Sequence, residues 1–223
     1  KASAAAHDET TIGPTSLAAL GASSARNAVV IALESTGAGA TSLYDGPKGP
    51  DTTPFLRELG ARGAVVERAY TTVPHTSKAL VSLLCGVMPK PQPGIEEAER
   101  DAIPTRCLPA LLKEHGYATA FFQPAEENYE RRADLVRELG FESFFGKESL
   151  DGAGFDESSY FGWEDRAMER PIDAWLDAHA KEPFLLTVLT LAAHHPYVLP
   201  RGVAPRKRVD AQPLNDYLDT VAY

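Results

Sequence analysis

Continuous apolar runs alternate along the chain with stretches whose apolar positions have helical spacing. The runs at 27–33 (NAVVIAL) and 184–191 (FLLTVLTL) have the pattern of strands buried on both faces of a parallel sheet. Weaker strand patterns occupy 64–70 and 117–122. Helical spacing, often bounded by proline or glycine, predicts helices at 54–63, 76–85, 108–116, 128–140, 171–181 and 214–223. This alternation predicts an α/β fold, a three-layer α/β/α sandwich with a mostly parallel central sheet.

The two ends of the chain depart from this alternation. Residues 1–26 are mostly small and polar without a clear period, so we expect a flexible N-terminal arm or linker there. The folded domain is then expected to span 27–223. The last helical pattern, 214–223, ends without a glycine or proline stop signal. We therefore expect a truncated domain that a C-terminal remainder of the same protein completes.

Composition and charge exclude several classes of function. The 223 residues carry 22 Lys+Arg against 31 Asp+Glu, a formal net charge of −9, which gives no basic surface for nucleic acid. The longest strongly apolar run, 184–193, is about half the length of a membrane span, so no transmembrane segment is expected in this chain.

Reactive side chains follow the ends of the strand patterns, where parallel sheets bind their ligands. Glu34 follows the first run, Thr76 and Ser77 open a helix after the second, and His194 follows the last. A hydroxyl at a helix N-terminus lies where the helix favours binding of an anion. A carboxylate beside this hydroxyl can hold a metal ion that activates the hydroxyl for attack. The pattern suits attack on a phosphate or sulfate ester. The alternative is that Thr76 only caps its helix and that Glu34 and His194 are solvated loop residues.

Longer stretches carry a family resemblance. NAVVIALEST, PDTTPFLRELGARGAVVERAYTTVPHTSKALVSLLCGVMP and LTLAAHHPY resemble the sulfatase and lipoteichoic-acid-synthase branch of the alkaline phosphatase superfamily. The resemblance covers about 27–223. It implies a metal-dependent phosphotransferase or phosphodiesterase that acts on a phosphate or sulfate ester, with lipid or cell-envelope head groups as candidate substrates.

The same resemblance singles out Thr76 as the nucleophile. Sulfatases read Tyr, five residues, Cys-x-Pro-x-Arg, and a Gly six residues after that Arg. With Tyr70 and Gly86 on the ends, the motif would require Cys at Thr76, Pro at Lys78 and Arg at Leu80, and all three are absent. A threonine matches the synthase branch, in which the nucleophile becomes transiently phosphorylated. Ser77 is the second choice. A sulfuric ester hydrolase without the formylglycine motif, or a non-catalytic fragment or binding module, are the alternative functions.

Further roles follow only from the resemblance. Glu34 and Thr76 match metal ligands, and the Asp-His pair that completes this site in the family is absent from the sequence. Such ligands favour Mn²⁺, Mg²⁺ or Zn²⁺ over Ca²⁺. The residues implied in substrate binding are His194, His75, Lys78, Trp163 and Arg166.

The two cysteines bear on the compartment. Cys85 and Cys107 lie 22 residues apart and form either a disulfide or a pair of buried thiols. A disulfide would stabilise the fold by about 3 kcal/mol through loop closure. Family members usually act outside the cytoplasm, where such a bond persists. The expected location is therefore the periplasm or cell surface, with the protein tethered to the membrane through a removed N-terminal segment.

Overall fold

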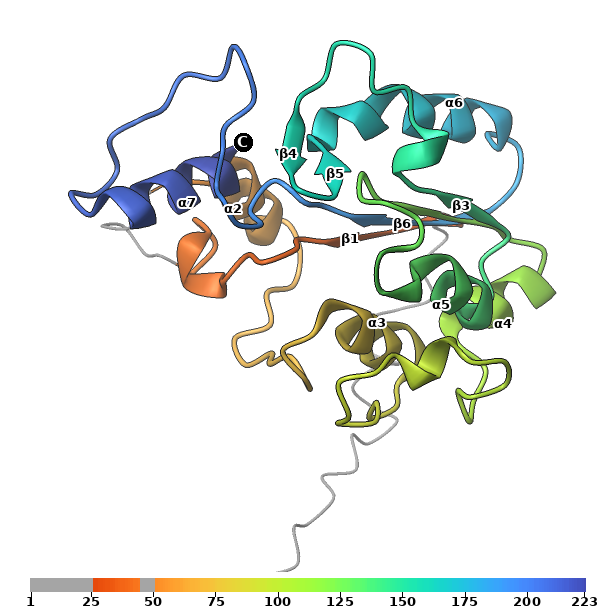
Figure 1. Cartoon of the computed structure of the whole chain (residues 1–223). Helices are drawn as coiled ribbons and strands as arrows, with labels where there is room; N and C mark the ends of the chain where they lie inside the picture. Colours follow the sequence, from red (N-terminus) through yellow and green to blue (C-terminus); the bar gives the residue numbers. More distant parts are fainter. Residues whose placement is uncertain (1–25, 45–50) are drawn as a thin grey trace, which may run out of the picture.

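A four-stranded parallel sheet forms the centre of the chain (Figure 1). The computed structural model describes residues 26–44 and 51–223, so the expected arm at 1–26 lies almost entirely outside the described residues. The strand order is β1-β6-β2-β3, and each neighbouring pair is parallel. The strands are β1 (Ala28–Ala32), β2 (Ala118–Phe122), β3 (Ser143–Phe145) and β6 (Phe184–Leu189). A short antiparallel ribbon adds β4 (Glu157–Ser159) and β5 (Gly162–Trp163).

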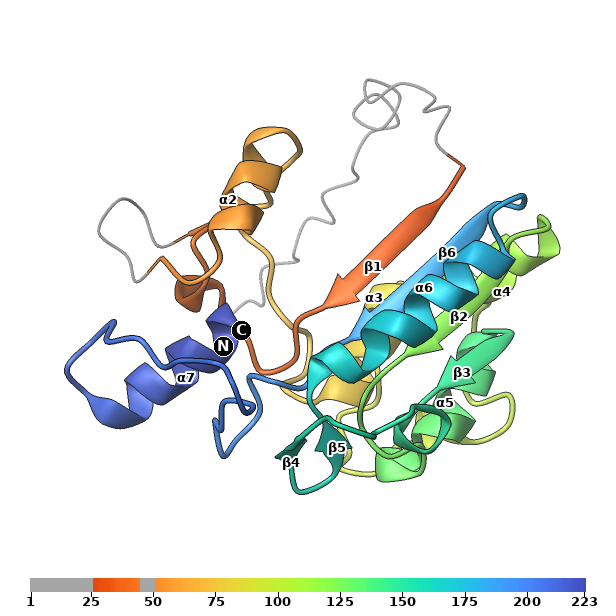
Figure 2. The ribbon, with the colours of Figure 1, turned by 90° about the horizontal axis from the view of Figure 1, so that it is seen from above.

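Helices cover both faces of this sheet, which confirms the predicted three-layer α/β/α fold. The helices are α2 (Pro54–Ala61), α3 (Thr76–Cys85), α4 (Leu108–Glu114), α5 (Arg132–Leu139), α6 (Glu169–Ala178) and α7 (Gln212–Ala222). Helices α3, α4 and α5 lie on one face and α6 on the other (Figure 1). Helices α2 and α7 lie beyond the carboxyl ends of β1 and β6 (Figure 2).

Two apolar clusters hold the layers together. On one face, Leu80 and Leu84 of α3 pack with Leu135 of α5 against Phe121 and Leu185 of the sheet. The other cluster places Trp175 of α6 over a second set of strand side chains, Phe122, Leu186 and Val188. Successive residues of a strand point to opposite faces, so the neighbours Phe121 and Phe122 serve different clusters.

Two strand predictions are wrong. β1 is not buried on both faces, because Val29 and Ile31 are 54% and 60% exposed. β1 lies at the end of the strand order, and within the part of the chain that the structure describes it pairs with β6 alone. The segment 64–70 forms no strand, and Val66 and Tyr70 in it are exposed. A β-branched run becomes a strand only where a partner strand satisfies its backbone, and this segment has none among the described residues.

The expected helix at 128–140 is shorter than its pattern. A 3₁₀ turn covers Tyr129–Arg131, and α5 begins only at Arg132. Glu130 and Arg131 have φ values of 53° and 55°, which is left-handed backbone that interrupts an α-helix. This break turns the Glu130 side chain toward α3, as its contact with Ser77 shows.

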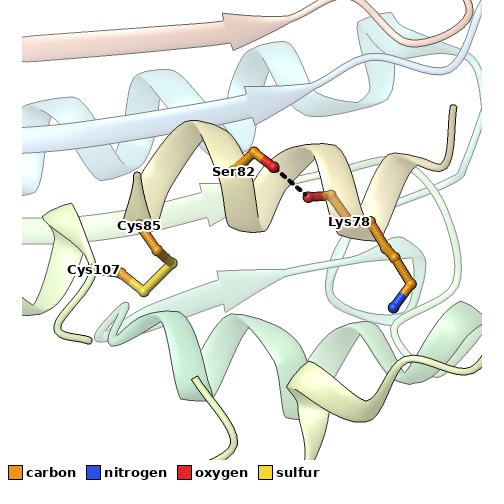
Figure 3. Close-up of a disulfide and its surroundings, with 4 residues drawn as sticks. All are labelled: Lys78, Ser82, Cys85 and Cys107. Carbon is orange, nitrogen blue, oxygen red and sulfur yellow. Dashed lines mark hydrogen bonds between the residues drawn. A yellow bond between two sulfur atoms is a disulfide. The ribbon is translucent and has the colours of Figure 1, made fainter. Parts of the chain in front are cut away.

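Of the two alternatives for the cysteines, the structure has the disulfide: Cys85 and Cys107 are joined with an S–S distance of 2.06 Å (Figure 3). It joins the last residue of α3 to the residue that precedes α4. The loop that it closes also carries Glu97, which binds Lys78 on the same side of α3 at 2.9 Å. Burial acts to raise the pKa of Glu97, but hydrogen bonds from Lys78 and from the Lys90 N–H leave it below its ordinary value. Helix α3 is therefore fixed at its C-terminus and along its length.

Candidate active site

Glu34 and Thr76 meet at the carboxyl edge of the sheet. Glu34 lies two residues after β1, and Thr76 is the first residue of α3. The Thr76 hydroxyl donates a hydrogen bond of 2.9 Å to Glu34 Oε1. The Glu34 backbone N–H donates to the Thr190 hydroxyl, just after β6, at 3.1 Å. The hydroxyl thus lies at the positive end of a ten-residue helix with a carboxylate beside it.

Helix α7 holds the loop that carries Glu34. The Tyr217 hydroxyl accepts a hydrogen bond from Gly37 N at 2.9 Å and donates one to Ser35 O at 3.1 Å. Ser35 has a φ of 52°, so the chain turns sharply directly after Glu34. These contacts fix the direction of the loop at the site.

Glu130 engages the residues on either side of Thr76. The fully buried Ser77 hydroxyl donates to Glu130 Oε2 at 2.7 Å. His75 Nε2 lies 3.3 Å from Glu130 Oε1, and His75 is half-buried. The Ser77 hydroxyl therefore bonds to Glu130, whereas the Thr76 hydroxyl bonds to Glu34.

Arg132, which the sequence reasoning missed, contributes a buried cation. Its NH2 lies 3.3 Å from Glu130 Oε2, while its Nε and NH1 are buried and have no hydrogen-bond partner among the described residues. Burial lowers the pKa of Arg132, and the carboxylates of Glu130 and Glu34 act in the opposite direction. The signal in the sequence is an arginine on an apolar stripe, because Leu135 and Val136 follow it on α5 and are buried.

A small cavity joins these groups. It measures about 60 Å³, and Glu34, Thr76, Arg132, Gln123 and His194 are among its lining residues. We call it the Arg132 cavity. A larger cavity of about 480 Å³ is also lined by Glu34 and Thr76, together with His75 and mainly apolar side chains. Of the substrate contacts expected from the sequence, His75 and His194 thus line cavities that share Thr76.

Asp165 braces the loop that carries His194. Its two carboxylate oxygens accept hydrogen bonds from Leu191 N at 2.7 Å and Ala192 N at 3.1 Å. His194 N in turn donates to Leu191 O at 2.9 Å, and the His194 ring contacts Phe161 with 5.1 Å between centroids. Burial raises the pKa of Asp165 to about 6, although the two backbone N–H groups oppose this shift.

This raised pKa predicts a pH dependence of stability. The folded protein binds a proton on Asp165 more tightly than the unfolded chain, so this stabilisation is complete below about pH 4 and is lost as the pH rises through about 6. Asp165→Asn removes the titration. Across this window, the unfolding free energy of the wild type minus that of the variant should fall by up to about 1.4 kcal/mol per pH unit. Urea denaturation of both proteins measures it, and a difference that stays constant with pH contradicts the assignment.

Three of the expected substrate contacts lie elsewhere. Lys78 is 1% exposed and pairs with Glu97. Trp163 belongs to the core under α6, with Lys147 Nζ 5.0 Å from its ring. Arg166 pairs with the buried Glu164 at 2.8 Å. None of these three residues lines either cavity at Thr76, so their contact with a substrate stays a prediction.

Two oxygen donors lie together where the sequence predicts part of a metal site. The Glu34 carboxylate and the Thr76 hydroxyl share one edge of the sheet and are the kind of donors that Mg²⁺ and Mn²⁺ prefer. Residues 26–44 and 51–223 contain no group of three or more His, Cys, Asp or Glu side chains able to hold a metal ion. The described residues could therefore supply two of the donors of a metal site.

A match to a family model shows the family of this chain. The family model described as Sulfatase matches residues 26–223. The chain belongs to the sulfatase family. Phosphoglycerol transferase I of Xanthomonas campestris pv. campestris (strain B100) is 26% identical over 168 residues, which is 70% of this chain and 24% of that protein. This sulfatase-family chain thus spans about a quarter of the length of the curated relatives it matches.

Solved structures show the same fold. Lipoteichoic acid synthase LtaP from Listeria monocytogenes superposes with a TM-score of 0.74 at 20% identity, over 88% of this chain and 48% of that one. A protein of the alkaline phosphatase superfamily from Vibrio parahaemolyticus gives 0.71 at 24% identity, with the same coverage of 88% and 48%. In the described residues of this sulfatase-family chain, no helix is long and apolar enough to cross a membrane.

Proposed function

We propose that this sulfatase-family chain carries the nucleophile of a phosphotransferase that cleaves a phosphodiester through a covalent Thr76 intermediate. The observation that carries the proposal is the hydrogen bond of 2.9 Å between Thr76 and Glu34 at the start of α3. A hydroxyl in this position lines the Arg132 cavity, where two nitrogens of the buried guanidinium have no hydrogen-bond partner among the described residues.

The proposed reaction has two displacements. Thr76 Oγ1 loses its proton and bonds to phosphorus, the bond from phosphorus to the first alcohol breaks, and that alcohol leaves with a proton. A second alcohol, or water, then attacks the phosphorylated Thr76 and restores its hydroxyl. The α3 N-terminus and Arg132 stabilise the negative charge that accumulates on the nonbridging oxygens. His194 and His75 are proposed to contact the substrate from the two cavities that meet at Thr76.

Glu34 and Thr76 are proposed to hold a divalent cation, Mn²⁺, Mg²⁺ or Zn²⁺. When bound, such an ion lowers the pKa of the hydroxyl and neutralises phosphate charge. The residues of this chain contribute the geometry, since Glu34 fixes the direction of the Thr76 hydroxyl and Thr190 fixes Glu34.

A phosphate ester is favoured over a sulfate ester as the substrate. The Cys-x-Pro-x-Arg motif from which sulfatases make formylglycine is absent around Thr76. One relative is named phosphoglycerol transferase I. For this reason, the first donor to test is one with a phosphoglyceryl group, as found in a lipid head group. The Cys85–Cys107 disulfide supports action outside the cytoplasm, where such bonds persist.

Trapping of the covalent intermediate tests the proposal. The full-length protein is mixed with phosphatidylglycerol and Mn²⁺, quenched in acid and digested for mass spectrometry. We expect the peptide with Thr76 to gain the mass of a phosphoglyceryl group, and fragmentation to place it on Thr76. The Thr76→Ala variant is the control. An unmodified peptide under turnover conditions, or a label on Ser77, contradicts the proposal.

A further inference from the structure

Glu130 places a second carboxylate at the Arg132 cavity, which it lines together with Glu34. Its Oε2 accepts a hydrogen bond from the Ser77 hydroxyl at 2.7 Å and lies 3.3 Å from NH2 of Arg132. Its Oε1 lies 3.3 Å from His75 Nε2. Hydroxyl, guanidinium and imidazole groups are donors that bind phosphate oxygens in proteins. In the free protein, Glu130 therefore engages groups that a phosphate would otherwise bind.

The backbone of this segment is bent where it carries the Glu130 carboxylate. Glu130 and Arg131 are both left-handed, with φ values of 53° and 55°. Two successive left-handed residues that have a Cβ are unfavourable and persist only where contacts hold them. Arg131 contributes ion pairs with Glu99 and Asp134, and Glu130 contributes its contacts at the cavity. The contacts of both residues therefore stabilise the turn and keep the carboxylate at the cavity.

The charges that line the cavity sum to a negative value. Its charged residues are Glu34, Glu130 and Arg132, so one guanidinium against two carboxylates gives −1, with His194 neutral. The volume is only about 60 Å³, so an anion at Thr76 lies close to these charges, with little water to screen them. Coulomb energy is proportional to the charge of the ligand, so a dianion meets twice the net repulsion that a monoanion meets. Removal of the Glu130 charge alone would bring the sum to zero and end this discrimination.

The charge of Glu130 is not needed for its contacts with the start of α3. The Ser77 hydroxyl requires only an acceptor, and an amide oxygen provides one as a carboxylate oxygen does. An amide also has an NH₂ group that can donate to the ring nitrogen of His75. Arg132 differs, because Glu130 is its one ionic partner among the described residues. The negative charge therefore acts on Arg132 and on an anion that enters the cavity.

We propose that Glu130 is a specificity-determining residue, which makes the site prefer a phosphodiester with one negative charge over a phosphate monoester with two. This inference rests on the proposed function. The discrimination depends on the charge of the phosphoryl group and is independent of the alcohol that leaves. A lipid that ends in a free phosphate is accordingly a poor substrate, although it offers the same leaving group.

A matched pair of lipids tests the preference. Phosphatidylmethanol and phosphatidic acid with the same acyl chains differ by one methyl group, which removes one charge. Attack by Thr76 breaks the bond from phosphorus to diacylglycerol in both, and leaves methyl phosphate or phosphate on the threonine. We measure kcat/KM for diacylglycerol release by the full-length protein with Mn²⁺ at pH 8, above the second pKa of a phosphate monoester, which is about 6. The ratio of the diester value to the monoester value is the diester preference.

Substitution of Glu130 locates the preference at this residue. In Glu130→Gln, the diester preference should fall by about tenfold or more, because juxtaposition of like charges is costly where they are poorly screened. Glu130→Ala removes the same charge and should act in the same direction, whatever the orientation of the new amide in the first variant. Glu126→Gln is the matched control, since its carboxylate is 47% exposed and lies 3.9 Å from Lys147 Nζ, and it should keep the wild-type preference.

The preference is insensitive to the fraction of folded protein, because both lipids are measured on one preparation. Either Glu130 variant, folded by circular dichroism, overturns the inference if it keeps the wild-type preference. A wild type that cleaves the monoester as fast as the diester also overturns it. In both cases a label on Thr76 from phosphatidylglycerol leaves the proposed function standing. No diacylglycerol release from either lipid, together with no label on Thr76, overturns the proposed function and the inference with it.

Discussion

Replacement of Thr76 by alanine is expected to lower phosphodiester turnover by about 10³-fold or more, because the variant lacks the atom that bonds to phosphorus. The fold should tolerate the change. Thr76 is half-buried at the first position of α3, and its hydroxyl bonds only outward to Glu34 in the contacts described. Steady-state release of the first alcohol measures the loss, and circular dichroism confirms the fold.

Two further variants make this result specific. Thr76→Ser keeps a hydroxyl on Glu34 and should retain turnover within about tenfold of the wild type. Ser77→Ala removes the second candidate nucleophile, whose hydroxyl is buried against Glu130, and should also remain active. If Ser77→Ala lost all turnover while Thr76→Ala kept it, the nucleophile would be Ser77.

Replacement of Arg132 by methionine is expected to lower kcat/KM by about 10²- to 10³-fold, since a preorganised cation at a developing negative charge contributes on this scale. The same variant should unfold at an equal or higher urea concentration. Arg132 is 3% exposed, and Glu130 is its one ionic partner among the described residues. Glu130 keeps Ser77 and His75 as partners when the arginine is removed, so the variant loses an incompletely compensated buried charge without leaving a carboxylate unpaired. Activity and stability should therefore change in opposite directions, which a role in folding alone would not produce.

Two control variants distinguish the effect of the charge of Arg132 from the effect of its position. Arg132→Lys keeps the charge without the planar fork and should recover part of the activity. Arg137→Met changes an exposed arginine on the same helix, paired with Asp134 at 2.8 Å, and should leave kcat/KM unchanged. Loss of both stability and activity in Arg132→Met, in equal proportion, contradicts a role in phosphate binding.

Much of the fold could be predicted from the sequence because local patterns determine it. β6 has the apolar run expected of a central strand, and its residues after Phe184 are buried. The prediction failed at 64–70, which has no partner strand among the described residues, and at β1, where Val29 and Ile31 stay exposed on one face. Neighbours distant in the sequence decide pairing, and hydrophobic period alone does not reveal them.

Some residues of the candidate site could be predicted from the sequence, and others could not. Glu34 and Thr76 could be expected together because each follows a strand pattern, and they do meet, although the pattern before Thr76 at 64–70 forms no strand. Arg132 could not, since its significance lies in being buried without a full set of partners. Lys78 shows how the helical period directs a side chain. Two residues further along a helix is about 200° around its axis, so its side chain points away from Thr76 into the core.

The position of β1 has a practical consequence for handling this polypeptide. Among the described strands it has one hydrogen-bonded neighbour, and its other side leaves backbone donors and acceptors next to the exposed Val29 and Ile31. An edge of this kind is a template for strand addition by a second molecule. Repulsion between copies with a net charge of −9 opposes such contacts at low ionic strength, and added salt screens it. Colloidal stability of these 223 residues is thus expected to depend on dilute, low-salt buffers.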